Sequence, residues 1–210
     1  NAFGYSNKIG NTQIGLLYKP PTQTSTIGAG NRAAGSQLSS GMVYDDGKLF
    51  ASAGYMEHYG IAAGKTGIDT RNWSLSGGYT VGDVKYKLSI VDVNQPYGVS
   101  FGGLATWPGI GVASDIRVYQ AGAIWQFNSK NKFLLSYYDA KNLKNSNNSA
   151  KWYVFEDNYA INSQLVWYTN FGLVQGSAGA NALTLGTGPN NMAQPGATTA
   201  AFGSGLIFRF

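Results

Sequence analysis

Apolar and polar residues alternate with a period of two along most of this 210-residue chain. In the segment 84–90, for example, the even positions are Val, Tyr, Leu and Ile, and the odd positions are Lys, Lys and Ser. Successive side chains of a β-strand point to opposite faces, so each such segment is predicted to be a strand with one apolar and one polar face. We find no helical period of comparable length, and the chain is therefore predicted to be all-β.

The alternation predicts ten strands in a single domain, residues 1–210. The strands span residues 12–19, 37–45, 48–57, 72–81, 84–93, 116–127, 132–140, 152–161, 164–178 and 198–210. The pattern is least regular in 152–161, where Glu156, Asp157 and Asn158 follow one another. A β-bulge at this point would restore the alternation.

Long and short connections alternate between these strands. The short ones carry turn-forming pairs: Asp46-Gly47, Gly82-Asp83 and Asn162-Ser163. The long ones span residues 20–36, 58–71, 94–115, 141–151 and 179–197. This arrangement predicts an antiparallel up-and-down meander with tight hairpins at one end and long loops at the other. It is typical of outer-membrane β-barrels, which have short periplasmic turns and longer external loops.

The composition indicates which face meets lipid. Charged residues make up 12% of the chain, about half of the ~25% usual in soluble domains. The positions on the predicted polar face are mostly Ser, Gly, Gln, Asn and Thr, whereas the surface of a soluble protein carries more charged residues. These features favour a transmembrane barrel whose apolar face contacts lipid and whose polar face lines a water-filled lumen. A soluble β-sandwich or barrel, with the apolar face inside, is the alternative.

Several strands end in aromatic residues at positions that belong to the predicted apolar face. Such rings suit the membrane–water boundary, because they are apolar with a polar edge. The residues predicted to form an aromatic girdle are Tyr18, Tyr44, Tyr55, Tyr79, Trp125, Phe127, Tyr137, Phe208 and Phe210. The last strand alternates apolar residues and stops on Phe210. This ending resembles the sorting signal of Gram-negative outer-membrane proteins, which implies recognition by the barrel-assembly machinery.

Four segments carry a family resemblance: Trp73–Tyr79, Lys132–Tyr137, Asp157–Ser163 and the strand ending at Phe210. With the meander, they resemble the general diffusion porins of the trimeric Gram-negative type, nearest to the β-proteobacterial branch. The resemblance implies a sixteen-stranded barrel, a homotrimer and a constriction formed by an inward-folded third loop. Because ten strands are predicted here, we expect the C-terminal part of such a porin, with the constriction loop upstream. A complete ten-stranded barrel is the competing interpretation.

The chain carries 15 Lys and Arg against 10 Asp and Glu. The cations predicted to line the pore have polar-face parity: Lys19, Lys48, Lys85, Lys87, Lys132 and Arg209. Cations around a lumen give it a positive potential and favour anions. Alternatively, these side chains lie at the barrel rims, where water or lipid headgroups solvate them, and cause no strong preference.

Other chemistry lacks support in the sequence. A catalytic base at His58, the one histidine, would need a nucleophile and an orienting partner, and no signature such as GxSxG is present. We therefore predict no enzyme activity, no metal site and no cofactor; the absence of cysteine also excludes disulfides. The lysines are scattered without a nucleic-acid-binding motif, so no nucleic acid partner is expected. The apolar loop 94–115 is expected to fold over the barrel mouth or to pack on a neighbouring protomer.

The sequence therefore predicts an outer-membrane channel that crosses the membrane many times and lets small hydrophilic solutes and ions diffuse passively, with a mild anion preference. The partners expected are outer-membrane lipid, lipopolysaccharide, the barrel-assembly machinery and two further copies of the chain. The alternative is a monomeric ten-stranded structural or adhesive outer-membrane barrel with a filled lumen.

Overall fold

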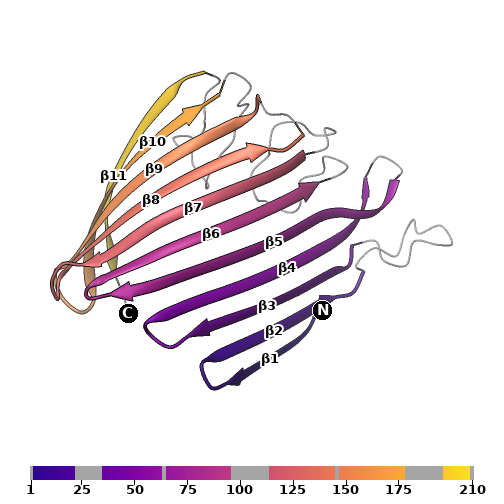
Figure 1. Cartoon of the computed structure of the whole chain (residues 1–210), viewed down its shortest axis with the longest axis horizontal. Helices are drawn as coiled ribbons and strands as arrows, with labels where there is room; N and C mark the ends of the chain where they lie inside the picture. Colours follow the sequence, from indigo (N-terminus) through magenta and orange to yellow (C-terminus); the bar gives the residue numbers. More distant parts are fainter. Residues whose placement is uncertain are drawn as a thin grey trace.

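The computed structural model describes residues 2–21, 35–62, 65–95, 114–144, 147–177 and 196–208, and within these ranges the chain forms β-strands and no helix. Each strand pairs antiparallel with the next one along the chain, so the sheet follows the order of the sequence without a crossover (Figure 1). The strands are β1 (Phe3–Ile9), β2 (Thr12–Lys19), β3 (Gln37–Asp45), β4 (Leu49–Ala62), β5 (Lys65–Val81), β6 (Val84–Gln95), β7 (Ser114–Gln126), β8 (Asn131–Asn142), β9 (Ser149–Ala160), β10 (Leu165–Gly176) and β11 (Thr198–Phe208). The predicted all-β up-and-down architecture is confirmed.

The prediction of ten strands is wrong by one, because the alternation does not reveal β1. Asn7 occupies the parity of Phe3, Tyr5 and Ile9 and interrupts the apolar row. The strand nevertheless pairs with β2 in a continuous register, from Phe3 opposite Tyr18 onwards. The intervening turn contains Gly10 at a φ of 58°, a left-handed conformation that glycine adopts without strain.

Two connections predicted to be long are shorter. β4 continues to Ala62 and β5 begins at Lys65, while β8 ends at Asn142 and β9 begins at Ser149. Polar residues end the alternation at these strand ends, but the ladder is made by backbone groups and continues past them. The predicted bulge in 152–161 is also wrong, because β9 keeps continuous register with β8 and β10. An irregularity lies instead between His58 and Tyr59.

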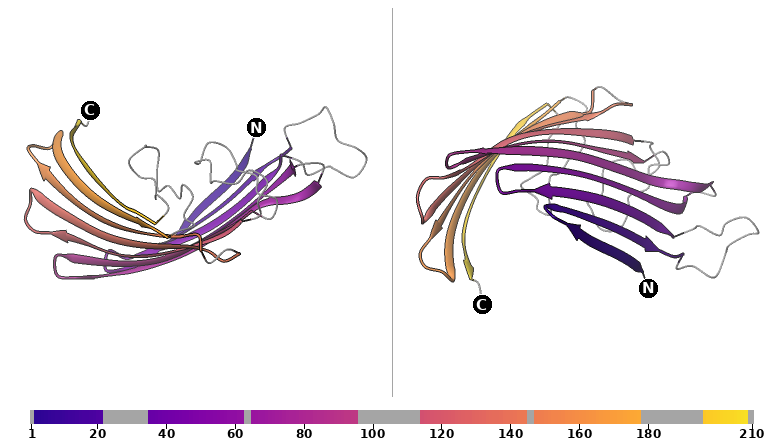
Figure 2. Two further views of the ribbon diagram at one scale, coloured as in Figure 1. Left: turned by 90° about the horizontal axis from the view of Figure 1, so that it is seen from above. Right: turned by 60° about the horizontal axis from the view of Figure 1, so that its bottom comes forward.

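The sheet is strongly curved, with one convex and one concave face (Figure 2). β1 and β11 form its two edges, and no pairing joins them within the described part of the chain. Closure into a sixteen-stranded barrel remains a prediction.

Apolar burial is distributed unlike that of a soluble protein. A buried cluster lies at the long-loop end of β7–β10 and consists of Ala140, Ala150, Trp152 and Val174, with Val118 and Tyr138 packed against it. By register, these residues share the face opposite to that of Tyr137 and Tyr153. Large apolar side chains on the other face are extensively exposed. Because soluble proteins bury such residues, the outer surface of this sheet is suited to an apolar medium.

Candidate functional site

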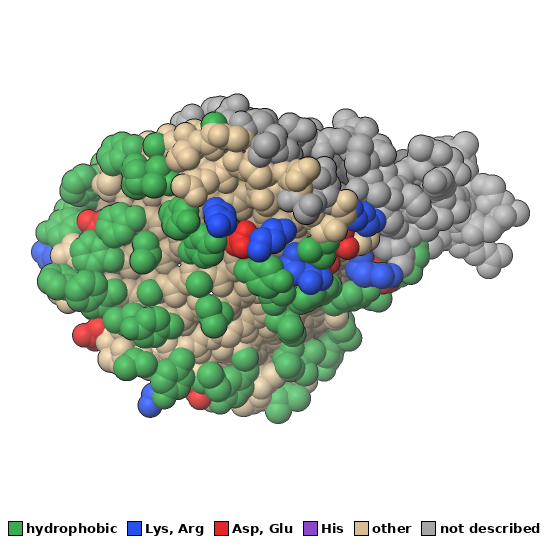
Figure 3. Space-filling model, turned by 45° about the horizontal axis from the view of Figure 1, so that its top comes forward, with side chains coloured by type: hydrophobic (Ala, Val, Ile, Leu, Met, Phe, Trp, Pro, Cys, Tyr) green, Lys and Arg blue, Asp and Glu red, His purple; other side chains and the backbone are tan. Residues whose placement is uncertain are grey.

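The residues that the alternation assigns to the apolar face lie on the convex side of the sheet, where apolar side chains form a broad surface (Figure 3). On β6, the exposed fractions of Tyr86 and Leu88 are 53% and 66%. A soluble barrel would hold these side chains in a dry interior. Their exposure on a continuous antiparallel sheet is the arrangement of a strand-based membrane protein.

Most of the predicted girdle residues have convex-face register. Tyr79 lies opposite Leu49, Tyr55 opposite Trp73 and Tyr137 opposite Tyr153. Phe127 follows the end of β7, and its ring packs edge-on against Trp125 at a centroid distance of 4.9 Å. Tyr18, Tyr44 and Phe208 also lie in convex-face rows, whereas Phe210 falls outside the described residues.

The predicted girdle leaves out Trp73 and Tyr119, although both lie on this face on the same strands as the predicted Tyr79 and Trp125. Trp73 and Tyr79 on β5, and Tyr119 and Trp125 on β7, are each separated by about six residues, or about 20 Å along the strand. They form two levels of aromatic rings on each of these strands, as aromatic girdles at the two membrane interfaces do. A search for a second aromatic at this interval on each strand would have identified them.

A belt of three ion pairs crosses the convex face near the long-loop end, visible as adjoining blue and red side chains in Figure 3. Its members are Glu57 with Arg71, Asp92 with Arg117, and Asp139 with Lys141. The shortest nitrogen–oxygen distances of these pairs are 3.2, 2.7 and 2.8 Å. We call this set the charged belt. The sequence analysis did not identify the charged belt, because its charged residues occupy positions of the apolar face near the strand ends, where the alternation stops.

The concave face carries polar side chains beside the apolar cluster around Trp152. At its middle, Ser89 on β6 donates a hydrogen bond of 2.8 Å to Gln120 on β7, and the Gln120 amide donates one of 3.0 Å to the Tyr138 hydroxyl on β8. Such a network satisfies polar groups across three strands. Polar side chains on this face can therefore form hydrogen bonds with water.

The structure places four of the six predicted pore-lining cations on concave-face strand positions: Lys19, Lys85, Lys87 and Lys132. Lys48 lies in the turn before β4, and its ammonium is 5.4 Å from the centre of the Tyr79 ring, which belongs to the convex face. Arg209 lies outside the described residues. The assignment of all six to the pore stays a prediction.

Two of these lysines are held together near the short-turn end. The ammonium groups of Lys85 and Lys87 lie 5.3 and 5.7 Å from the centre of the Phe50 ring on β4. Lys85 is also 3.8 Å from the carboxylate of Asp45 at the end of β3. Attraction to the ring face and to the carboxylate keeps the positive charges over the concave wall.

Cations outnumber carboxylates on the concave face. Among strand positions with described side chains, the cations are Lys8, Lys19, Lys85, Lys87 and Lys132, and the carboxylates are Asp45 and Glu156. Glu156 accepts a hydrogen bond of 2.6 Å from the Asn158 amide. The face therefore carries an excess of positive charge.

Within the described ranges, no group of three or more His, Asp or Glu side chains could hold a metal ion. Nor does any helix in this part of the chain have the length and apolarity needed to cross a membrane. His58 lies on β4, opposite Gln37 and Thr70.

A family model described as Gram-negative porin matches residues 1–179. This chain belongs to that family. The predicted resemblance is thereby confirmed, and the two-faced sheet has the architecture expected of such porins. The comparison with curated proteins gives no match.

Solved porin structures share the fold. An anion-selective porin from Comamonas acidovorans superposes with a TM-score of 0.76 at 18% identity, over 100% of this chain and 59% of that one. A trimer form of OmpT, an outer-membrane protein of Vibrio cholerae, gives 0.62 at 14% identity, over 99% and 64%. A further structure described as porin gives 0.61 at 11% identity, over 99% and 60%. The present porin thus spans about three fifths of the length of these structures.

Proposed function

We propose that this porin contributes to a water-filled channel in the bacterial outer membrane, through which small hydrophilic solutes and ions diffuse passively. The observation that carries the proposal is the separation of the two faces. Exposed Tyr86 and Leu88 lie on the convex face, while the Ser89–Gln120–Tyr138 hydrogen bonds line the concave one. In a membrane barrel the first face contacts lipid and the second contacts water.

The uncharged part of β5 on the convex face has a height that fits a membrane. On β5, about ten residues separate Arg71 of the charged belt from Val81 at the hairpin, which is about 34 Å along the strand. A strand tilt of about 40° reduces this length to a height of about 26 Å, close to the ~25 Å apolar band of outer-membrane barrels. The same interval separates Arg117 from Phe127 along β7 and its turn.

We further propose a mild anion preference. Lys85 and Lys87 lie over the concave wall with Asp45 as the nearby carboxylate. A low-dielectric wall focuses such a field into the water beside it and concentrates anions. The anion-selective porin from Comamonas acidovorans, with its shared fold, supports this proposal.

The assembly is proposed to be a homotrimer, as in the trimer form of the Vibrio cholerae protein. Unpaired strand edges are unfavourable in lipid, so closure requires β1 and β11 to find strand partners. We propose that further strands of the same barrel supply them. No catalytic role is proposed for His58, since passive diffusion needs none.

The full-length porin in a planar lipid bilayer tests these proposals. Stepwise conductance increases are expected, and a KCl gradient should give a reversal potential of the sign for anion selectivity. Replacing both Lys85 and Lys87 by Glu should shift selectivity towards cations, whereas Lys130→Glu with Lys144→Glu, outside the strands, should change it little. Correctly inserted protein without conductance would favour the alternative of a structural barrel with a filled lumen. A cation-selective wild type would refute the anion preference.

A further inference from the structure

The charged belt lies directly above an apolar hollow on the convex face. We propose that the two together bind one phosphate-bearing lipid of the outer leaflet, with its phosphate on the exposed cations and an acyl chain in the hollow. This site lies on the face opposite to the channel, so it goes beyond the proposed diffusion function.

The cations of the belt are exposed and their partner carboxylates are buried behind them. The side chains of Arg71, Arg117 and Lys141 are 48%, 31% and 51% exposed, whereas those of Glu57, Asp92 and Asp139 are 15%, 7% and 15% exposed. Each carboxylate therefore holds its cation at a fixed place, while the cation faces outwards. In each pair the cation is therefore the group presented to a ligand.

The two arginines retain capacity for a second anion. A guanidinium has five N–H donors. Arg117 directs Nε and one Nη towards Asp92, and Arg71 directs Nε towards Glu57. A phosphate can accept the remaining donors in the bidentate geometry that guanidinium favours.

Aromatic rings set the depth of these charges. The guanidinium carbon of Arg117 lies 5.7 Å from the centre of the Trp73 ring, and the ammonium of Lys141 lies 5.9 Å from that of Tyr119. Trp and Tyr rings occupy the level of lipid headgroups. The cations above them are therefore at the level of headgroup phosphates.

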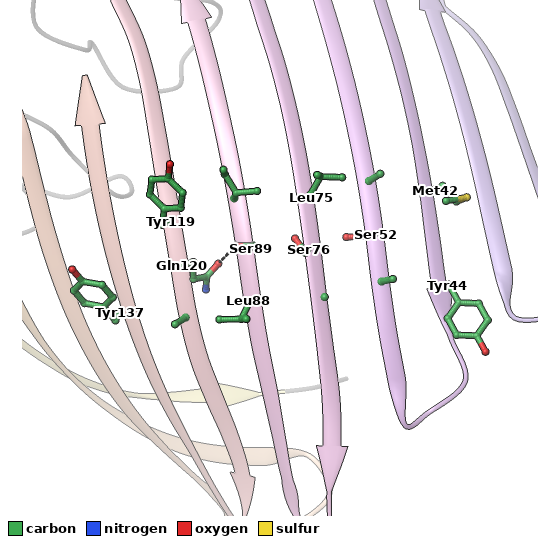
Figure 4. Close-up of a pocket in the computed structure, with 15 residues that line it drawn as sticks. Met42, Tyr44, Ser52, Leu75, Ser76, Leu88, Ser89, Tyr119, Gln120 and Tyr137 are labelled. Atoms are coloured by element: carbon green, nitrogen blue, oxygen red, sulfur yellow. Dashed lines mark hydrogen bonds between the residues drawn. The ribbon is translucent and has the colours of Figure 1, made fainter. Parts of the chain in front are cut away.

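Small side chains create the hollow below the belt. Its volume is about 750 Å³, and its lining includes Ala51, Gly77 and Ala121 beside Leu75, Leu88 and Tyr119 (Figure 4). By register, Ala51 lies opposite Gly77, and Leu88 lies between Gly77 and Ala121.

The distance between hollow and belt suits one lipid molecule. Along β7, the lining residues Tyr119 and Ala121 lie two and four residues from Arg117, or about 7 and 14 Å. This interval leaves room for the glycerol or saccharide part of a lipid between its phosphate and its acyl chain.

A second copy of the porin fits this surface less well. Subunits of one membrane assembly sit at the same depth, so a neighbouring belt would bring its own exposed Arg71, Arg117 and Lys141 to the same level. Like charges at this level repel, whereas an anionic lipid neutralises them.

The test uses the full-length porin, depleted of lipid in detergent micelles and titrated with bisphosphorylated lipid A, with bound lipid counted by native mass spectrometry. A belt variant combines Arg71→Gln, Arg117→Gln and Lys141→Gln. Its control combines Lys85→Gln, Lys87→Gln and Lys132→Gln, which removes the same charge from the concave face. We expect about tenfold or greater loss of affinity in the belt variant and little change in the control. Equal losses in both, or none in the belt variant, would overturn the proposal.

Two further experiments test the proposal even if the belt variant does not fold. The wild-type porin should bind dephosphorylated lipid A at least about tenfold more weakly than the bisphosphorylated form; equal binding would overturn the proposal. A Cβ at Gly77 would lie 3.7 Å from its nearest neighbour, the Phe50 carbonyl oxygen, so Gly77→Leu with Ala121→Leu fills the hollow without backbone conflict at Gly77. This variant should bind lipid A more weakly than Ala200→Leu, a control on β11. Displacement of the lipid by an equal concentration of inorganic phosphate would overturn a lipid-specific site.

Discussion

Gly78 lies beside the backbone of Tyr86 across the β5–β6 pair, and a Cβ at Gly78 would stand 2.5 Å from the Tyr86 carbonyl oxygen. Because this neighbour is backbone, it cannot move aside without separating the strands. We predict that Gly78→Ala destabilises the folded porin by about 1–3 kcal/mol, the usual cost of overpacking. The fraction of protein that stays folded on partially denaturing gels, as urea increases, measures the effect.

Gly77 provides the matched control on the same strand. It points to the opposite face, and its Cβ would make only an ordinary contact of 3.7 Å. Gly77→Ala should therefore unfold at nearly the wild-type urea concentration. Equal destabilisation by both substitutions would show that loss of glycine itself, rather than the close approach to Tyr86, is the cause.

The alternation predicts the middle of β2–β11 well, because parity fixes the face of every residue once one face contacts an apolar medium. The prediction fails where polar or charged residues occupy positions of the apolar face. Asn7 hides β1, and Glu57 and Arg71 end the apolar pattern although the backbone ladder continues beyond them. The same failure hides the charged belt, since Arg71 and Lys141 fall in predicted loops and their partners Glu57 and Asp139 lie at the ends of predicted strands.

The concave charges were predicted only in part, for a related reason. Parity places Lys85 and Lys87 on the polar face, but their shared contact with Phe50 depends on the pairing of β4, β5 and β6. Lys48 has polar parity too, yet its place in a turn lets its ammonium reach the ring of Tyr79. Side-chain direction beyond a strand end is not determined by alternation.

Removal of a concave carboxylate should strengthen the anion preference. Asp45 lies 3.8 Å from Lys85, and Asp45→Asn leaves that positive charge uncompensated on the concave face, which we propose lines the channel. We expect the reversal potential in a KCl gradient to shift further in the anion-selective direction, and Glu156→Gln to act in the same sense. Asp83→Asn, which removes the same charge from a hairpin turn, should shift it less. A shift towards cations in Asp45→Asn would contradict the assignment of this face to the pore.

The Asp46 carboxylate organises the hairpin between β3 and β4. It accepts hydrogen bonds from the backbone N–H groups of Leu49 at 2.6 Å and Lys48 at 2.8 Å, and from the Tyr44 hydroxyl at 2.9 Å. These bonds, led by that from Leu49, lower the pKa of Asp46 below its ordinary value of 3.8. A lowered folded-state pKa means that the stabilisation is present above pH 3.8 and is lost as the pH falls through the folded-state value.

Asp46→Ala should therefore lower the unfolding temperature of the porin at neutral pH. The difference from the wild type should narrow below pH 3.8, as the wild-type carboxylate becomes protonated. Asp46→Asn, which keeps one acceptor oxygen, should lie between the two proteins. A difference that stays constant down to acid pH would mean that the carboxylate charge does not contribute.

The ion pair between Asp92 and Arg117 is the most buried link of the charged belt, with side chains 7% and 31% exposed. Asp92→Asn removes the negative charge that two nitrogen atoms of Arg117 contact, at 2.7 and 2.8 Å. We expect a loss of about 1.5–3 kcal/mol in the free energy of unfolding, the range for hydrogen bonds to charged groups. Arg117→Gln should cost a similar amount.

The double variant decides whether the two residues act as a pair. If they do, Asp92→Asn with Arg117→Gln should be less destabilising than the sum of the single changes by about 1 kcal/mol or more, measured by urea unfolding in detergent micelles. Asp92→Asn combined with Asp46→Asn serves as the control, because these sites lie at opposite ends of the strands and their effects should add. Additive losses in the first double variant would mean that the belt is a row of independent charges, each solvated at the membrane boundary.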